Sequence, residues 1–119
     1  MVSAFPTPHT DSANSTIDLN ELLQIKRYST VLFRMKGDSM SDLGIFDGDI
    51  LIVDKSIPAK HGHVVLAFVD QEVTVKTLYK RGYTVRLLPA NTSYKPIELI
   101  EGQEMQILGV VTARIRMLT

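Results

Sequence analysis

Two residues whose types can do chemistry together stand out in the sequence, a serine and a lysine. Ser39 lies in a turn-like segment at residues 35–40, with the sequence Met-Lys-Gly-Asp-Ser-Met. Lys76 lies inside an alternating apolar stretch at residues 73–78. A serine hydroxyl is a weak nucleophile until a base removes its proton, and a lysine can be that base only while its amine is neutral. The pair therefore predicts nucleophilic attack by Ser39, with Lys76 as the general base.

A neutral amine requires a particular environment for Lys76. The ordinary pKa of lysine is about 10.4, and burial in an apolar setting lowers it by disfavouring the charged form. In an extended strand, Lys76 shares one face with Thr74 and Leu78. We therefore expect the amine to lie among largely aliphatic side chains.

Simpler interpretations of both residues are also open. A lysine in a strand is usually solvated, and a serine in a Gly-Asp-Ser sequence is often only a turn former. Ser39 could instead pair with a histidine, as in other serine hydrolases. Residue types alone do not choose among these alternatives.

Metal binding is a further alternative, although the sequence favours no metal and no cofactor. His61 and His63 flank a glycine, but no cysteine or carboxylate cluster accompanies them. Asp47, Asp49 and Asp54 could hold a cation. They are also typical of turns and strand edges around a glycine, which is the interpretation we favour.

Composition narrows the class of protein. The 119 residues are 45% hydrophobic, enough for one domain with a real core. Lys+Arg and Asp+Glu number 13 each, so no net charge attracts the chain to nucleic acid or a membrane. There is no cysteine, no long apolar run and no pattern typical of a signal peptide. We expect a cytoplasmic protein without a membrane partner.

The elements that must position the two residues are mostly strands. Residues 1–16 predict an extended arm, and residues 17–25 a short helix capped by Asp18, with Glu21 completing a capping box. Strands are expected at 31–35, 49–53, 64–69, 73–78, 83–88 and 105–118, with a hairpin turn at 79–82 and a bend or bulge at Gly109. The sequence thus predicts an all-β fold with an arm and helix at 1–29 and a β domain at 30–119.

Several motifs together resemble the LexA/UmuD family of S24-type, self-processing Ser-Lys peptidases, and the UmuD branch in particular. Residues 37–40 resemble the nucleophile motif, residues 47–54 the strand that follows it, and residues 73–76 the lysine motif. Residues 88–97 resemble the next family block, and residues 5–8 and 17–23 resemble the UmuD arm. Motifs in the right order and spacing are more specific than any one alone.

The resemblance implies a LexA/UmuD-like, signal-peptidase-like β domain that forms homodimers. It implies that Ser39 and Lys76 form a catalytic dyad. The backbone N–H groups of Asp38 and Ser39 are the expected oxyanion donors, since a turn at Gly37 can expose both. The final strand also carries Leu108, Val110 and Leu118 on its second face, which favours a partner subunit.

The resemblance also implies partners. UmuD-like proteins cleave their own arm when stimulated by a RecA–single-stranded DNA filament, and the product joins a UmuC-like polymerase. Residues 1–29 leave no room for the operator-binding helix-turn-helix of LexA-like members, so we expect no direct sequence-specific DNA binding.

One departure from the family favours one of two functions and leaves the other open. The family cuts at Ala-Gly or Cys-Gly just before the segment matching residues 5–8, whereas Ser3-Ala4 stands there and the first glycine is Gly37. We therefore expect the processed, UmuD'-like form: a homodimeric accessory subunit of an error-prone translesion polymerase in the SOS response to DNA damage. The alternative is an active serine peptidase that cleaves the arm of a UmuD-like partner in trans.

Overall fold

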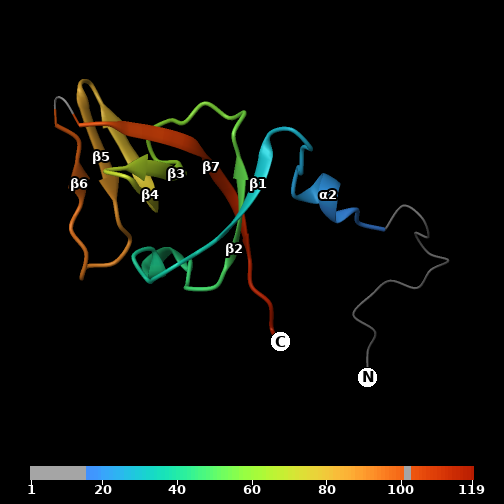
Figure 1. Cartoon of the computed structure of the whole chain (residues 1–119). Coiled ribbons are helices and arrows are strands. Elements are labelled where there is room, and N and C mark those ends of the chain that lie inside the picture. The colour runs from blue at the N-terminus through green and yellow to red at the C-terminus, as the bar shows by residue number, and fades with distance from the viewer. Residues whose placement is uncertain (1–15, 101–102) are drawn as a thin grey trace.

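Seven strands form one antiparallel sheet in the order β1-β2-β7-β3-β4-β5-β6 in the computed structural model, which describes residues 16–100 and 103–119 (Figure 1). The strands are β1 Thr30–Arg34, β2 Ile50–Asp54, β3 Val64–Val69, β4 Glu72–Arg81, β5 Thr84–Leu88, β6 Ile97–Glu98 and β7 Met105–Ile115. The helix α2 spans Leu19–Leu22, and a single 3-10 turn, η2, spans Ser41–Leu43. The predicted all-β fold with one short helix is confirmed.

The two nearly continuous apolar stretches form inner strands, as expected. In β2, Leu51 and Val53 are fully buried, and in β3 the same holds for Val65 and Ala67. Both strands pair with β7, which crosses the middle of the sheet. Side chains on both faces of these strands are covered, which explains why neither sequence alternates between apolar and polar residues.

The long strand β7 bends at two bulges. Leu108 has no partner between the pairs Leu66–Gly109 and Ala67–Ile107, and Thr112 has none between the β2 pairs on either side. The bulge expected at Gly109 is therefore found beside it. A Cβ on Gly109 would lie 2.6 Å from Val53 Cγ1, so only glycine lets the two backbones approach this closely.

The hairpin between β4 and β5 turns later than predicted. The ladder continues to the pair Arg81–Thr84, so the turn consists of Gly82 and Tyr83 rather than residues 79–82. Gly82 has a φ of 57°, which suits the first position of a two-residue hairpin turn. The sequence 79–81 extends β4 because its backbone groups pair with β5.

The N-terminal helix is shorter than the predicted 17–25. The Asp18 carboxylate caps it by accepting a hydrogen bond from Asn20 N at 2.9 Å, as expected. The leucines do not form a packed face, however, since Leu19 and Leu22 are 66% and 63% exposed. In Figure 1 the helix stands outside the sheet on the side of β1. The predicted arm lies outside the described residues, except for residue 16.

The core consists of two clusters. One, built on Val65, Leu78, Leu87 and Val110, lies among β3, β4, β5 and β7. The other contains Met35, Met40, Leu51, Val53 and Val75. It covers the segment around Ser39, because the two methionines that flank the serine are only 3% and 0% exposed.

The apolar second face of β7 does not support the argument for a dimer that we drew from the sequence. Val110 is 4% exposed and belongs to one core cluster, while Leu108 packs against the other. Only Leu118, at 96% exposed, stays uncovered by the described residues. The bulges of β7 turn these residues inward, so a period-two reading of the whole strand was wrong.

Candidate active site

The structure brings Ser39 and Lys76 together. Lys76 Nζ donates a hydrogen bond to Ser39 Oγ at 3.1 Å. The serine comes from the segment between β1 and η2, and the lysine from the middle of β4. Both side chains are buried, with 7% and 8% of their residue surfaces exposed. A nucleophile and a base in hydrogen-bond contact, shielded from water, are the geometry that covalent catalysis requires.

The Ser39 segment is held in place by its backbone. Met35 N donates to Asp49 O, and Gly48 N donates to Met35 O, each at 2.8 Å. Gly37 N donates to Asp47 Oδ1 at 2.7 Å. Gly37 has a φ of 81°, a left-handed conformation that other residues adopt with strain. These hydrogen bonds fix the Gly-Asp-Ser turn to the loop before β2, so its position depends on that loop.

The environment of Lys76 favours a neutral amine. Burial lowers the pKa of the Lys76 amine below its ordinary value. Among the ion pairs of residues 16–100 and 103–119, none includes Lys76, so no carboxylate holds the charged form. The amine is therefore suited to accept a proton from Ser39.

Thr74 is a third member of the site, and the sequence reasoning gave it no role. Lys76 Nζ lies 2.5 Å from Thr74 Oγ1, in hydrogen-bond contact. Two residues apart on β4, the side chains share one face, which is the signal that could have indicated the contact. The Thr74 hydroxyl holds the amine in the direction of Ser39.

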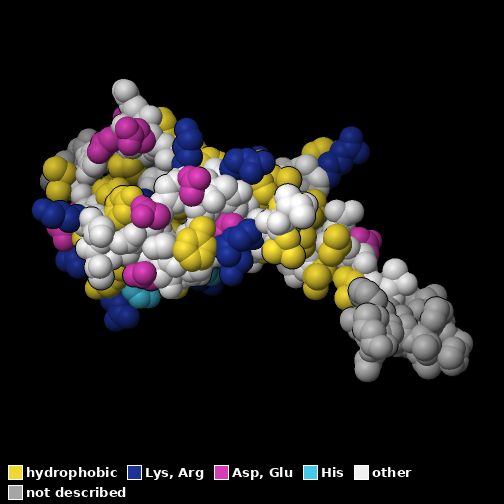
Figure 2. Space-filling model, turned by 90° about the horizontal axis from the view of Figure 1, so that it is seen from below, with side chains coloured by type: hydrophobic (Ala, Val, Ile, Leu, Met, Phe, Trp, Pro, Cys, Tyr) yellow, Lys and Arg dark blue, Asp and Glu magenta, His cyan; other side chains and the backbone are white. Residues whose placement is uncertain are grey.

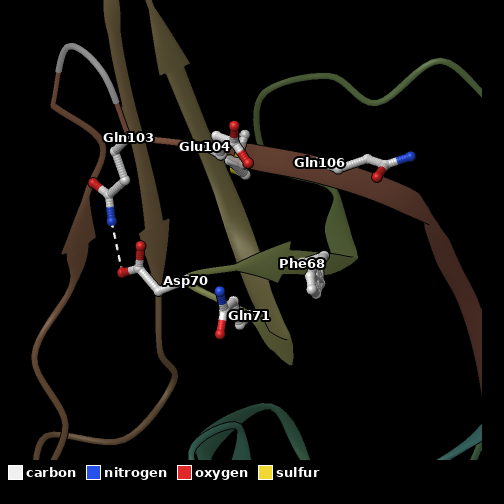
Figure 3. A pocket seen from close by; sticks show the side chains of 7 residues that line it. Phe68, Asp70, Gln71, Gln103, Glu104 and Gln106 are labelled. Atoms are coloured by element: carbon white, nitrogen blue, oxygen red, sulfur yellow. Dashed lines mark hydrogen bonds between the residues drawn. The ribbon is translucent and has the colours of Figure 1, made fainter.

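A narrow cleft surrounds the pair. Its volume is about 80 Å³, and it is lined by Phe33, Met35, Lys36, Ser39, Val73, Thr74, Val75 and Lys76. A different and larger hollow, of about 640 Å³, is bordered by Asp70, Gln103 and Glu104 among others. Figure 3 shows its lining side chains, among which Gln103 Nε2 donates to Asp70 Oδ2. That hollow contains neither Ser39 nor Lys76. The cleft at the pair is much the smaller of the two.

The histidines, which the sequence left open as partners of Ser39 or as metal ligands, make other contacts. His61 Nδ1 accepts from Lys80 N at 3.1 Å, and His63 Nδ1 accepts from Lys60 N at 3.0 Å. Within the described part of the chain, no hydrogen bond joins a histidine to Ser39. The structure thus places a lysine, and not a histidine, on the Ser39 hydroxyl.

The three aspartates serve the turns, as favoured from the sequence. Asp54 accepts from Ser56 N and pairs with Lys26 at 3.2 Å, while Asp47 holds the Gly37 turn. Arg116 donates to both oxygens of Asp49, and this contact lowers the pKa of the Asp49 carboxyl to about 2. Over the described ranges, no three side chains of His, Cys, Asp or Glu gather as metal ligands would.

The helices in the described part of the chain are all too short or too polar to cross a membrane.

The chain is similar in sequence to one protein family and to several known proteins. A family model described as Peptidase S24-like matches residues 2–112. The LexA repressor of Alcanivorax borkumensis is 38% identical over 116 residues, which cover 98% of this chain and 56% of the repressor. The LexA repressor of Thiobacillus denitrificans is 46% identical over 86 residues, which cover 71% of this chain and 43% of the repressor. The chain spans about half the length of these curated relatives.

Proposed function

Because the chain belongs to the peptidase S24-like family, the LexA/UmuD family of Ser-Lys peptidases, we propose that it is a serine peptidase that uses Ser39 and Lys76. The observation that carries this proposal is the 3.1 Å hydrogen bond between Lys76 Nζ and Ser39 Oγ inside a buried cleft. Few other roles require a buried lysine with a hydroxyl, and not a carboxylate, as its partner.

The proposed reaction has two halves. Neutral Lys76 takes the hydroxyl proton while Ser39 Oγ bonds to the carbonyl carbon of the substrate. The C–N bond then breaks, and Lys76 returns the proton to the leaving amine, which leaves an acyl ester on Ser39. Water hydrolyses this ester, again with Lys76 as the base. The backbone N–H groups of Asp38 and Ser39 are proposed to hold the negative oxygen.

The proposed substrate is an extended peptide with a small residue before the scissile bond. A cleft of about 80 Å³ has room for a side chain the size of alanine or cysteine. This agrees with the Ala-Gly and Cys-Gly sites that the family resemblance implies. This sequence contains neither dipeptide, so we propose cleavage in trans of the arm of a UmuD-like partner, stimulated by a RecA–single-stranded DNA filament.

Mass spectrometry tests this function. A full-length UmuD-type substrate whose own catalytic serine is replaced by alanine is incubated with this protein, with and without a RecA filament. We expect one cut at the Ala-Gly or Cys-Gly bond, faster with the filament, and none with Ser39→Ala. Equal cleavage by wild type and Ser39→Ala, or no cleavage at all, would contradict the proposal.

A second role is favoured by the N-terminal residues. Residues 5–8 and 17–23 resemble the UmuD arm, and Ile17, Leu19 and Leu22 are each more than 60% exposed. Figure 2 shows hydrophobic side chains on the surface of the described part of the chain. Apolar side chains left uncovered in this way suit a protein partner. We therefore also propose a homodimeric accessory subunit of a UmuC-like translesion polymerase.

Two measurements test the second role. Sedimentation at micromolar concentration should show a species of twice 13.3 kDa, and a 13.3 kDa species alone would contradict the homodimer. Wild type and Ser39→Ala should capture the polymerase equally, because replacement of one buried hydroxyl leaves the surface unchanged. Loss of capture by a folded Ser39→Ala protein would contradict a binding role that is independent of catalysis.

A further inference from the structure

The segment after β5 is hydrogen-bonded to the segment that carries the nucleophile. Ala90 N donates to Ser39 O at 2.8 Å, and Asp42 N donates to Ala90 O at 2.7 Å. These two bonds tie residue 90 to both sides of Met40, which is itself fully buried. The backbone around Ser39 therefore depends on residues more than 50 positions away.

Asn91 holds the residue that precedes the nucleophile. Its Nδ2 donates to the backbone oxygen of Asp38 at 2.9 Å, and to Ser41 Oγ at 3.3 Å. Its Oδ1 accepts from Ser93 N at 2.9 Å. Because Ser93 N can only donate, the oxygen of the amide must face it, and the NH₂ group must face Asp38. The orientation of the Asn91 side chain is thereby fixed.

The contact to Asp38 O determines the direction of the Ser39 N–H. A trans peptide unit is planar, with its C=O and N–H pointing in opposite directions, and the described residues contain no cis peptide bond. A donor that holds the Asp38 carbonyl therefore holds the Ser39 N–H as well. Among the hydrogen bonds of the described residues, none uses the Ser39 N–H as donor, so it is available to a ligand.

We propose that Asn91 is a positioning residue that aims the Ser39 N–H at the oxyanion of the substrate. The proposal rests on the peptidase function proposed above. Asn91 touches neither Ser39 Oγ nor Lys76 Nζ; it acts through the peptide unit between Asp38 and Ser39. Preorganised donors of this kind stabilise the transition state because they do not have to reorient during the reaction.

Tyr94 supplies a matched control. Its hydroxyl donates to Asp38 Oδ1 at 2.5 Å, and this contact raises the pKa of the Tyr94 phenol above its ordinary value. The contact holds the Asp38 side chain, which can rotate about its Cα–Cβ bond without turning the peptide unit. Loss of the Tyr94 hydroxyl should therefore affect the Ser39 N–H much less than loss of the Asn91 amide.

The first measurement does not need catalysis. The residual dipolar coupling of the Ser39 N–H reports the direction of that bond in weakly aligned, ¹⁵N-labelled protein. We expect Asn91→Ala and Asn91→Asp to change the Ser39 coupling and to leave the couplings of the buried strands β2 and β3 unchanged. In Tyr94→Phe, the Ser39 coupling should stay as in wild type. An unchanged Ser39 coupling in both Asn91 variants would overturn the proposal.

The second measurement is the rate of trans cleavage. We expect kcat of Asn91→Ala to fall about ten- to hundredfold, since removal of an oxyanion donor itself costs about a hundredfold or more. KM should stay within about twofold, and the pH at half-maximal rate should not move, because Lys76 is untouched. Suppose that an Asn91 variant has a changed Ser39 N–H coupling but keeps the kcat of wild type. This result would overturn the proposal that the direction of the Ser39 N–H contributes to catalysis. If wild type cleaves nothing, the proposed function fails, while the coupling still decides the role of Asn91.

Discussion

Lys76 Nζ and Ser39 Oγ lie 3.1 Å apart, although 37 positions separate the two residues in the chain. The amine has a second hydroxyl contact, to Thr74 Oγ1. Two hydroxyl groups and no carboxylate surround it within the described residues. Hydroxyl acceptors orient the amine and stabilise its charged form much less than a carboxylate would, so burial can still lower the pKa of Lys76, as a lysine base requires.

Replacement of Thr74 by valine should therefore impair the base. Thr74→Val keeps the shape but removes the oxygen that accepts a hydrogen bond from the amine, so the amine is less well aimed. We expect kcat for trans cleavage to fall about tenfold. Loss of an acceptor disfavours the charged form, so the pKa of Lys76 should fall further and the rate should reach its half-maximum at lower pH. Thr77→Val is the matched control. Thr77 lies on the same strand with its side chain on the other face, so this variant should behave as wild type. Equal kinetics for Thr74→Val and Thr77→Val would contradict the role of Thr74.

Arg116 should matter for stability because its partner is buried. Asp49 is 1% exposed and accepts from Arg116 Nε at 2.7 Å, and the guanidinium lies over the Phe46 ring at 4.6 Å. Arg116→Met leaves the Asp49 carboxylate buried without its partner. We expect the free energy of unfolding at pH 7 to fall, by less than the loss of a fully buried ion pair would cause, because the Arg116 side chain is partly exposed. Arg114→Met removes a charge that acts on Asp49 without a hydrogen bond to it among the described residues, so it should cost less in a urea titration.

Acid should reduce the difference between wild type and Arg116→Met. The folded-state pKa of Asp49 is about 2, below the ordinary 3.8. The stabilisation by this pair is therefore fully present above about pH 4 and is lost as the pH falls towards 2. Unfolding free energies of the two proteins measured from pH 7 to pH 2.5 should converge. A difference that stays constant over this range would show that Arg116 acts by packing and not by its charge.

Gly109 should tolerate no side chain. A Cβ there would lie 2.6 Å from Val53 Cγ1 and 3.1 Å from the Asp54 backbone oxygen. We expect Gly109→Ala to reduce the free energy of unfolding by about 1–3 kcal/mol, as overpacked cores do. Val53→Ala removes the closer of the two atoms, so the double variant should lose clearly less than the sum of the single variants. Strict additivity would show that the side chain of Val53 is not the obstacle.

Much of the fold could be predicted because its signals are local. The apolar runs of β2 and β3 predict buried strands by themselves, and the Gly37 turn predicts a sharp bend at the nucleophile. The motif order and the 37-residue spacing predicted the Ser39–Lys76 contact. Thr74 was named as a neighbour of Lys76 on one face, but a strand pattern does not tell which neighbour donates or accepts.

The remainder depends on contacts distant in the sequence. Arg116 and Asn91 are 67 and 53 positions from the residues that they hold, Asp49 and Asp38, and no local pattern links such pairs. The bulges in β7 change which face of the sheet its side chains point to. Alternation alone therefore placed Val110 on a face open to a partner subunit, whereas it lies in the core. The helix at Leu19–Leu22 is short because nothing in the described chain covers its leucines, and packing, not propensity, sustains short helices.

The central claim is that neutral Lys76 is the base for Ser39, and the rate of trans cleavage against pH tests it most directly. For wild type we expect a rate that rises with pH as the Lys76 amine loses its proton, with a midpoint below the ordinary lysine pKa of about 10.4. Lys76→Ala should be inactive for want of a base, and Lys76→Arg should be inactive because a guanidinium stays charged. A rate independent of pH, or a Lys76→Arg protein as active as wild type, would contradict the account and leave Ser39 as a turn residue.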